Sequence, residues 1–162
     1  MQTPPAQNLI DLWQLSNSVI HRQCQGLSQA ESLLQLPFQG NCLNWVVGHM
    51  LKGRDDCLKW LGLPPLLSEA EFAVYTGGCE PLTDPARASD LDSLLARLDQ
   101  ALEMLTAAIQ ERGDEGLREA VKLFGEDSQL GGALAFLQWH EAYHLGQLEL
   151  LRQLAGKGDK VI

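Results

Sequence analysis

The sequence lacks the excess of basic residues that nucleic-acid binding requires. It has 12 Lys and Arg against 21 Asp and Glu, with a formal net charge of -9, whereas binding to a phosphate backbone depends on clustered positive charge. It also contains no apolar run of about 18 residues, the length of a membrane-spanning helix, and MQTPPAQNLIDLW at its start has no basic region followed by an apolar one. We therefore expect a cytoplasmic protein whose partners are neither nucleic acids nor membranes.

Paired cysteine motifs are absent as well. Cys24, Cys42, Cys57 and Cys79 are scattered, without a C-x-x-C pair or a secretory signal. Disulfide frameworks and thiolate zinc sites both depend on characteristic spacings. We therefore predict free or buried thiols, and Cys57, two turns beyond His49, is expected to be a small apolar side chain rather than a ligand.

Almost no segment shows the period-two alternation of a half-buried strand, whereas helical periodicity is frequent. Apolar residues recur at three- and four-residue spacing in long segments bounded by Gly, Pro, Asn and Ser, which typically begin or end helices. In a chain of 162 residues this pattern predicts one all-α domain, residues 1–162, folded as an antiparallel four-helix bundle. The predicted helices run from about Pro5 to Gly26, Asn41 to Leu61, Ser89 or Asp90 to Gly113, and Ser128 to Gly156.

The connections between these helices differ in length. Residues 62–85 are rich in Gly, Pro, Thr and acidic residues and predict a long crossover between the second and third helices, which could cover a pocket. GLSQAESLLQLPF, ahead of the second helix, predicts a short helical turn ended by Pro37. In GLREAVKLFGEDSQ, between the third and fourth helices, Leu117, Val121 and Phe124 predict a turn or two of helix.

Three histidines fall where the helices need apolar residues. His140 and His144 are four apart in WHEAYHLGQLELLRQLAG, a rise of about 6 Å, so both rings project from one helix face. His49 lies on the apolar stripe of the second helix. A single histidine there is most often a core residue with a hydrogen-bond partner, but three would need three sets of partners, each omission costing about 1–3 kcal/mol. A metal ion satisfies all three imidazoles at once, so we predict a metal site.

The segment HEAYH also matches the H-E-x-x-H pattern of zinc-protease helices, in which Glu141 would be the general base. That chemistry needs a further ligand downstream or a sheet edge that holds the peptide, yet no histidine follows His144 and no strands are predicted. We therefore disfavour a protease. Glu141 is either a residue that orients a metal ligand or a surface charge, and the second interpretation is favoured.

These segments resemble a known family. NWVVGHM, Asn44 to Met50, and HEAYHLGQLELLRQLAG, His140 to Gly156, together with GLSQAESLLQLPF, are similar to the DinB-like superfamily, also called YfiT-like, over nearly the whole chain. The resemblance implies a four-helix bundle with one divalent ion, nickel, zinc or iron, bound by one histidine of the second helix and two of the fourth, here His49, His140 and His144. It also implies a homodimer.

The resemblance implies that the ion activates a low-molecular-weight thiol, such as bacillithiol, mycothiol or glutathione, for transfer to a small electrophile. Hydrolysis by a metal-bound hydroxide is the alternative, and Glu141 or another carboxylate would then act as base. A third hypothesis is a non-catalytic bundle that binds a metal or senses a small molecule. A structural ion would have four protein ligands and no pocket, and the sequence offers only three obvious ligands. This favours an open site and an enzyme.

One charged residue near the predicted site is a candidate for binding the thiol. Arg54, five residues after His49, could pair with a carboxylate of the thiol. A solvated helix charge beside Asp55 and Asp56 is nevertheless the favoured interpretation of Arg54.

The remaining aromatic and histidine residues have simpler expectations. Trp45, Trp60 and Trp139 flank the predicted site in sequence and could form the wall of an apolar pocket, but filling the core is the favoured interpretation. His21 falls beside the apolar stripe of the first helix and is predicted to be a surface residue.

Overall fold

The computed structural model describes residues 3–159 and 161, and in that part of the chain helices are joined by loops and a single β-hairpin. The all-α prediction is confirmed. No helix of the described part is both long and apolar enough to cross a membrane. The long helices are α1 (Ala6–Cys24), α3 (Leu43–Trp60), α5 (Leu91–Gly116) and α6 (Leu130–Leu154), and the shorter elements are α2 (Gln29–Ser32), α4 (Glu69–Val74), the 3-10 turn η1 (Pro85–Arg87), β1 (Ala120–Leu123) and β2 (Glu126–Gln129).

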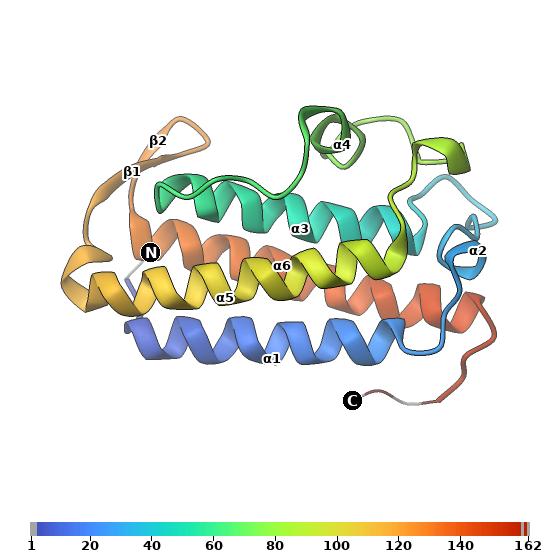
Figure 1. The fold of residues 1–162 in the computed structure, drawn as a ribbon, viewed down its shortest axis with the longest axis horizontal. Coiled ribbons are helices and arrows are strands. Elements are labelled where there is room, and N and C mark those ends of the chain that lie inside the picture. The colour runs from blue at the N-terminus through green and yellow to red at the C-terminus, as the bar shows by residue number, and fades with distance from the viewer. Residues whose placement is uncertain (1–2, 160, 162) are drawn as a thin grey trace.

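The four long helices lie side by side, and each packs against two others (Figure 1). Helix α1 contacts α5 and α6, and α3 contacts the same two helices. The crossover predicted for residues 62–85 is present and carries the chain back along the bundle, so α3 and α5 run in the same direction (Figure 1). Hydrogen bonds join these two helices at both ends: Asn44 donates to the carbonyl of Ser89, and Arg112 donates to the carbonyl of Leu61.

Local signals in the sequence explain where three of the helices begin. Ser28 and Ser68 start α2 and α4 with capping boxes, in which the serine hydroxyl accepts from the backbone N–H three residues later and the glutamate there accepts from the serine N–H. Asp90 caps α5 through the N–H of Ser93. Gly113, the predicted end of the third helix, has a φ of 59° and breaks the regular helix, although one more short turn follows it.

The segment between α5 and α6 corrects one prediction. Residues expected to add a turn or two of helix instead form an antiparallel hairpin, with Ala120 opposite Gln129 and Leu123 opposite Glu126. The two turn residues Phe124 and Gly125 both have positive φ, 51° and 87°, which is the requirement of the tight turn that suits the twist of a two-stranded ribbon. Helix α6 consequently begins at Leu130, after the hairpin.

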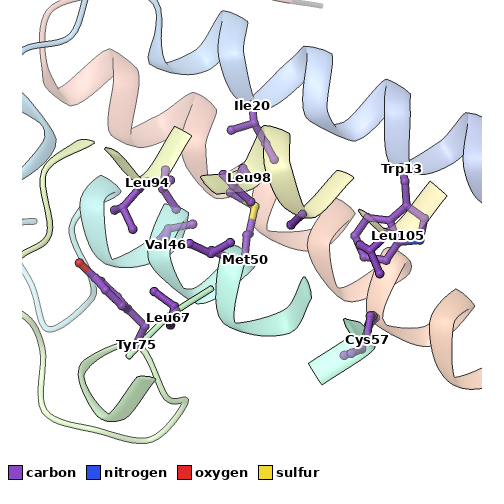
Figure 2. Close-up of a cluster of buried hydrophobic side chains, with 14 of the residues drawn as sticks. Trp13, Ile20, Val46, Met50, Cys57, Leu67, Tyr75, Leu94, Leu98 and Leu105 are labelled. Atoms are coloured by element: carbon purple, nitrogen blue, oxygen red, sulfur yellow. The ribbon is translucent and has the colours of Figure 1, made fainter. Parts of the chain in front are cut away.

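The core lies along the line where the four long helices meet (Figure 2). The core includes Trp13 and Ile20 of α1, Met50 of α3 and Leu94, Leu98 and Leu105 of α5, all of which are almost fully buried. Tyr75, which follows α4, also turns its ring into this core (Figure 2). The crossover is therefore packed against the bundle at Tyr75. All four cysteines are free thiols, as predicted.

Candidate functional site

The three histidines predicted as ligands lie together between α3 and α6. His49, His140 and His144 each offer one ring nitrogen, and these three nitrogens all lie within 4.8 Å of one another. The Nε2 atoms of His140 and His144 are 3.2 Å apart, and the His49 ring centroid is 4.8 Å from that of His144. The fold therefore brings an imidazole of α3 against two imidazoles one turn apart on α6.

Hydrogen bonds determine which ring nitrogens of His49 and His144 are free to bind a metal ion. The Nδ1 atom of His49 lies 2.7 Å from the backbone carbonyl of Tyr75. A carbonyl can only accept, so Nδ1 carries the proton and Nε2 keeps its lone pair. The Nδ1 atom of His144 pairs in the same way with Oε1 of Gln147 at 2.6 Å. Metal-binding histidines characteristically hold their second nitrogen in such a bond.

The carbonyl of Tyr75 is held in place by contacts of the same residue. Its hydroxyl donates to Oδ1 of Asn44 and accepts from the N–H of Ser89. Its ring lies against the backbone of Gly48, where a Cβ would stand 2.4 Å from ring carbons. Only glycine permits this approach, and the next residue is His49. The sequence analysis missed Tyr75 because its partner is 26 residues away, whereas the three-residue spacing of Gln147 from His144 is a signal that could have been found.

The imidazoles are electrically neutral at neutral pH. The pKa of His49 is lowered to about 4, chiefly by burial and to a smaller extent by nearby His144 and His140, although its bond to Tyr75 acts in the opposite direction. Burial also lowers the pKa of His140 and of His144. Neutral imidazole is the form that binds metals, so no proton has to be removed from these ligands before an ion can bind.

The donor set fits a divalent transition-metal ion. Two nitrogens at about 2.0–2.1 Å from a tetrahedral zinc are themselves about 3.3 Å apart, and the measured distance between the two Nε2 atoms of α6 is 3.2 Å. Among the described residues, no fourth His, Cys, Asp or Glu joins the cluster. Three ligands and an open position are typical of catalytic rather than structural sites.

A cavity of about 540 Å³ opens beside the histidines. Its wall includes Trp45, whose ring stacks on that of His49 at a centroid distance of 4.7 Å and an interplanar angle of 10°. Gly77, in the crossover, lines the cavity as well, which agrees with the expectation that this connection covers a pocket. The other lining side chains are of three kinds: aromatic (Phe38 and Tyr143), amide-bearing (Gln39, Asn41 and Gln147) and aliphatic (Leu36, Val46, Leu150 and Leu151).

A second cavity, of about 280 Å³, touches the same cluster at His49 and His140. It differs from the first in its charged lining, because Lys52 and Asp56 both reach it. These two side chains form an ion pair with a distance of 2.6 Å between Nζ and Oδ2. The histidine cluster is thus bordered by an uncharged cavity and by a smaller one with a paired cation.

The two weaker candidates, Arg54 and Glu141, are found together and away from the first cavity. Arg54 is fully buried and binds both carboxylate oxygens of Glu141, at 2.9 and 2.8 Å. The interpretation of both as surface charges is therefore wrong, because each one satisfies the other inside the bundle. Neither lines either of the two cavities, so these contacts give no support to Arg54 as a thiol-binding residue or to Glu141 as a base.

The tryptophans, Cys57 and His21 named in the sequence analysis lie in different surroundings. Trp45 is part of the cavity wall, whereas Trp139 is 60% exposed and does not fill the core. Trp60 is half-buried and borders a pocket that contains none of the three histidines. Cys57 is fully buried and lines neither cavity, as expected. His21 lies near the surface and pairs with Asp99 at 2.7 Å.

Comparisons with known proteins agree with this fold. A family model described as the DinB superfamily matches residues 17–148, which include all three histidines. A solved structure described as a conserved protein from Enterococcus faecalis is similar with a TM-score of 0.70, at 13% sequence identity, over 92% of this chain and 95% of that one. No curated protein matches the sequence. At this low identity, the likeness to the solved structure concerns the fold alone.

Proposed function

The chain belongs to the DinB superfamily, and on that premise we propose that it is a metal-dependent enzyme that transfers a low-molecular-weight thiol to a small electrophile. His49, His140 and His144 hold one divalent ion, nickel, zinc or iron. The observation that carries the proposal is the convergence of three neutral imidazoles from two helices beside an open cavity. A core with no ligand would gain nothing from this arrangement, because leucines would fill the same space at lower cost in desolvation.

The residues around the histidines have defined tasks in this proposal. The Tyr75 carbonyl and the Gln147 amide keep a proton on Nδ1 of His49 and of His144, so that both Nε2 atoms point lone pairs at the ion. Trp45 stacks on His49 and restricts rotation of its ring. A bound divalent ion would lower the pKa of a thiol or of water and thereby supply a nucleophile at neutral pH.

Hydrolysis is the second candidate function, and the cavity linings argue against it. A general base is needed within hydrogen-bond reach of the attacking water. Glu141 is engaged by Arg54, and Asp56, in the smaller cavity, is paired with Lys52. A free thiol, with a pKa of about 8.5, is far more acidic than water, with a pKa of about 15.7, so it needs less help from a base to be deprotonated at the ion, and thiol transfer agrees better with an uncharged cavity. A non-catalytic metal-binding or sensing role is the remaining alternative.

The experiment that tests the proposal measures the metal content of untagged protein. Wild type is expected to hold about one ion per chain, and His49→Ala and His140→Ala are expected to hold almost none. His21→Ala is the matched control, because His21 is paired with Asp99 outside the cluster and its loss should leave the metal content unchanged. Turnover of electrophiles would then be compared with and without added thiols. A wild-type protein that stays metal-free when divalent ions are supplied contradicts the proposal.

We also propose that the chain forms a homodimer through the outer face of α6. Trp139, Tyr143 and Leu150 are each about 60% exposed or more on this helix, and Gly146 lies between them with no atom near its missing side chain. Large exposed apolar side chains on one face typically mark an interaction surface. Tyr143 and Leu150 also line the first cavity, so a partner chain on this face would border its mouth.

A further inference from the structure

In the described part of the chain, the wall of the cavity beside the histidines has no charged side chain, since the imidazoles themselves are neutral. Among the described residues, 15 line it, and none is Asp, Glu, Lys or Arg. Its polar groups are neutral, namely the amides of Gln39, Asn41 and Gln147 and the hydroxyl of Tyr143. Most protein sites that take a carboxylate or a phosphate use Arg, Lys or backbone N–H groups arranged for that purpose. This wall presents no such side chain.

The cations near the cavity are already engaged elsewhere. Arg54 gives both carboxylate-facing nitrogens to Glu141. Lys52 opens on the other cavity and is paired with Asp56. Arg152 follows a lining residue directly, yet its guanidinium donates to the carbonyls of residues 23 and 25 and to Asp159. None of these three side chains lines the cavity, so none is placed to pair with an anion inside it.

A charge brought into the cavity would therefore be desolvated without compensation, except at the metal. Three neutral imidazoles leave the full charge of a divalent ion in place, so one anionic donor bound directly to that ion is favoured. A second anionic group, farther along the ligand, would lose its hydration and gain no partner. The net charge of -9 adds a long-range repulsion of the same sign.

The wall instead suits an apolar or aromatic body. Trp45, Phe38 and Tyr143 offer aromatic surfaces, and Val46 and Leu150 offer aliphatic ones. Aromatic rings stack on or against such surfaces without needing charge. Gln39 and Asn41 could bind a neutral carbonyl or amide at the far end of a ligand.

From this distribution of charge we infer that the cavity takes a neutral molecule with an apolar or aromatic body, and that a thiol bound there carries no carboxylate remote from its sulfur. The inference names the substrate class of the site and rests on the proposed function, since the thiol would bind at the histidines. The inference excludes thiol substrates that are recognised through a carboxylate paired with a cationic side chain of the protein.

The test uses cobalt-loaded protein and two thiols of nearly equal size, 4-(sulfanylmethyl)benzamide and 4-(sulfanylmethyl)benzoate. The charge lies across the ring from the sulfur, so the two differ mainly in the remote group. Binding is followed by the visible spectrum of the cobalt ion. The benzamide is expected to bind at least about tenfold more tightly, which corresponds to about 1.4 kcal/mol. Equal affinity, or tighter binding of the benzoate, overturns the inference.

A pair of variants makes the test specific to the cavity. Gln39→Lys places a cation in the wall and is expected to reduce or reverse the preference for the benzamide. Gln110→Lys adds the same charge on an exposed position of α5, a helix that contributes no residue to the cavity, and is expected to leave the preference unchanged. An equal effect of both variants would attribute the preference to net charge and would contradict the inference.

A second measurement separates this inference from the proposed function. Metal-free protein is titrated with 4-methylbenzamide and 4-methylbenzoate, which carry no sulfur, while the side-chain amide NMR signals of Gln39 and Asn41 are recorded. The inference expects these signals to shift with the benzamide and to shift little with the benzoate. If the protein fails to bind cobalt, only the proposed function is contradicted. If the Gln39 and Asn41 signals shift as much with the benzoate as with the benzamide, the inference is contradicted.

Discussion

Arg54 of α3 and Glu141 of α6 form a bidentate ion pair closed off from solvent, with 2.9 Å from Nε to Oε2 and 2.8 Å from Nη2 to Oε1. The same guanidinium donates to Oδ1 of Asn17 in α1 and to the carbonyl of Leu98 in α5. One side chain therefore bonds to the other three long helices. Because Glu141 directly follows His140, this pair also holds α3 and α6 in the register that brings the histidines together.

Removing one partner of this pair should be far more damaging than removing both. Arg54→Met leaves a buried carboxylate without a partner and is expected to lower the free energy of unfolding by about 3–5 kcal/mol. Arg54→Met combined with Glu141→Leu replaces the pair by apolar groups and should recover most of that loss. Urea unfolding of the two variants measures the difference. A single variant as stable as wild type would show that Glu141 finds another partner.

The bond between Gln147 and His144 should matter for the metal more than for folding. Gln147→Ala removes the acceptor of the Nδ1 proton and is expected to weaken metal binding by about 10–100-fold, with a smaller change in stability. Competition with a chelator measures the metal affinity. Gln153→Ala is the control on the same helix, because Gln153 is exposed and its side-chain amide bonds to Glu149 rather than to a histidine. An affinity equal to wild type in Gln147→Ala would contradict this role.

Two glycines of α3 should respond oppositely to alanine. At Gly48 a Cβ would lie 2.4 Å from the ring of Tyr75, so Gly48→Ala is expected to displace the crossover, lower stability by about 1–3 kcal/mol and weaken metal binding through His49. At Gly53 nothing lies within 4 Å, and Gly53→Ala should raise stability by about 0.5–1 kcal/mol through the helix backbone. Thermal unfolding measures both changes. Loss of stability in both variants would contradict the packing described for Gly48.

The anchoring of the crossover to α5 should weaken in acid. Burial alone would raise the pKa of Glu71, but hydrogen bonds from Ser68, Ser89 and Arg97 outweigh it and hold the pKa at about 2. A pKa below the ordinary value means that the carboxylate stabilises the folded state above about pH 4.5. This contribution is lost as the pH falls toward 2. The stability difference between wild type and Glu71→Gln should therefore shrink over that range, and a difference independent of pH would contradict this assignment.

The proposed dimer can be tested without touching the histidines. Trp139 is exposed on the outer face of α6 and lines neither of the cavities at the histidines, so Trp139→Lys should disrupt a dimer by placing charge in its interface. Sedimentation velocity is expected to show a dimer for wild type and a monomer for the variant, with equal metal content. Leu15, which is 61% exposed on α1 and lines neither cavity, provides the control Leu15→Lys. A monomeric wild type removes the dimer proposal.

Periodicity was sufficient for the long helices and for the placement of the three histidines on their apolar faces. The four-residue spacing of His140 and His144 fixes two rings on one face whatever the helix packs against, and caps such as Asp90 set a boundary from neighbouring residues alone. The hairpin was missed because its strands are only four residues long, too short for alternation to stand out, and its turn is formed by a phenylalanine in a backbone conformation that phenylalanine rarely adopts.

The sequence by itself determined which faces of the helices are buried and which histidines lie on them, because helical spacing is a property of neighbouring residues. Only the tertiary structure decided that Arg54 is a buried partner of Glu141, that Tyr75 orients His49, and that the cavity wall is uncharged. Each of these depends on the register between helices far apart in the chain. That register results from the packing of the whole core, in which the contribution of any one residue depends on all the others.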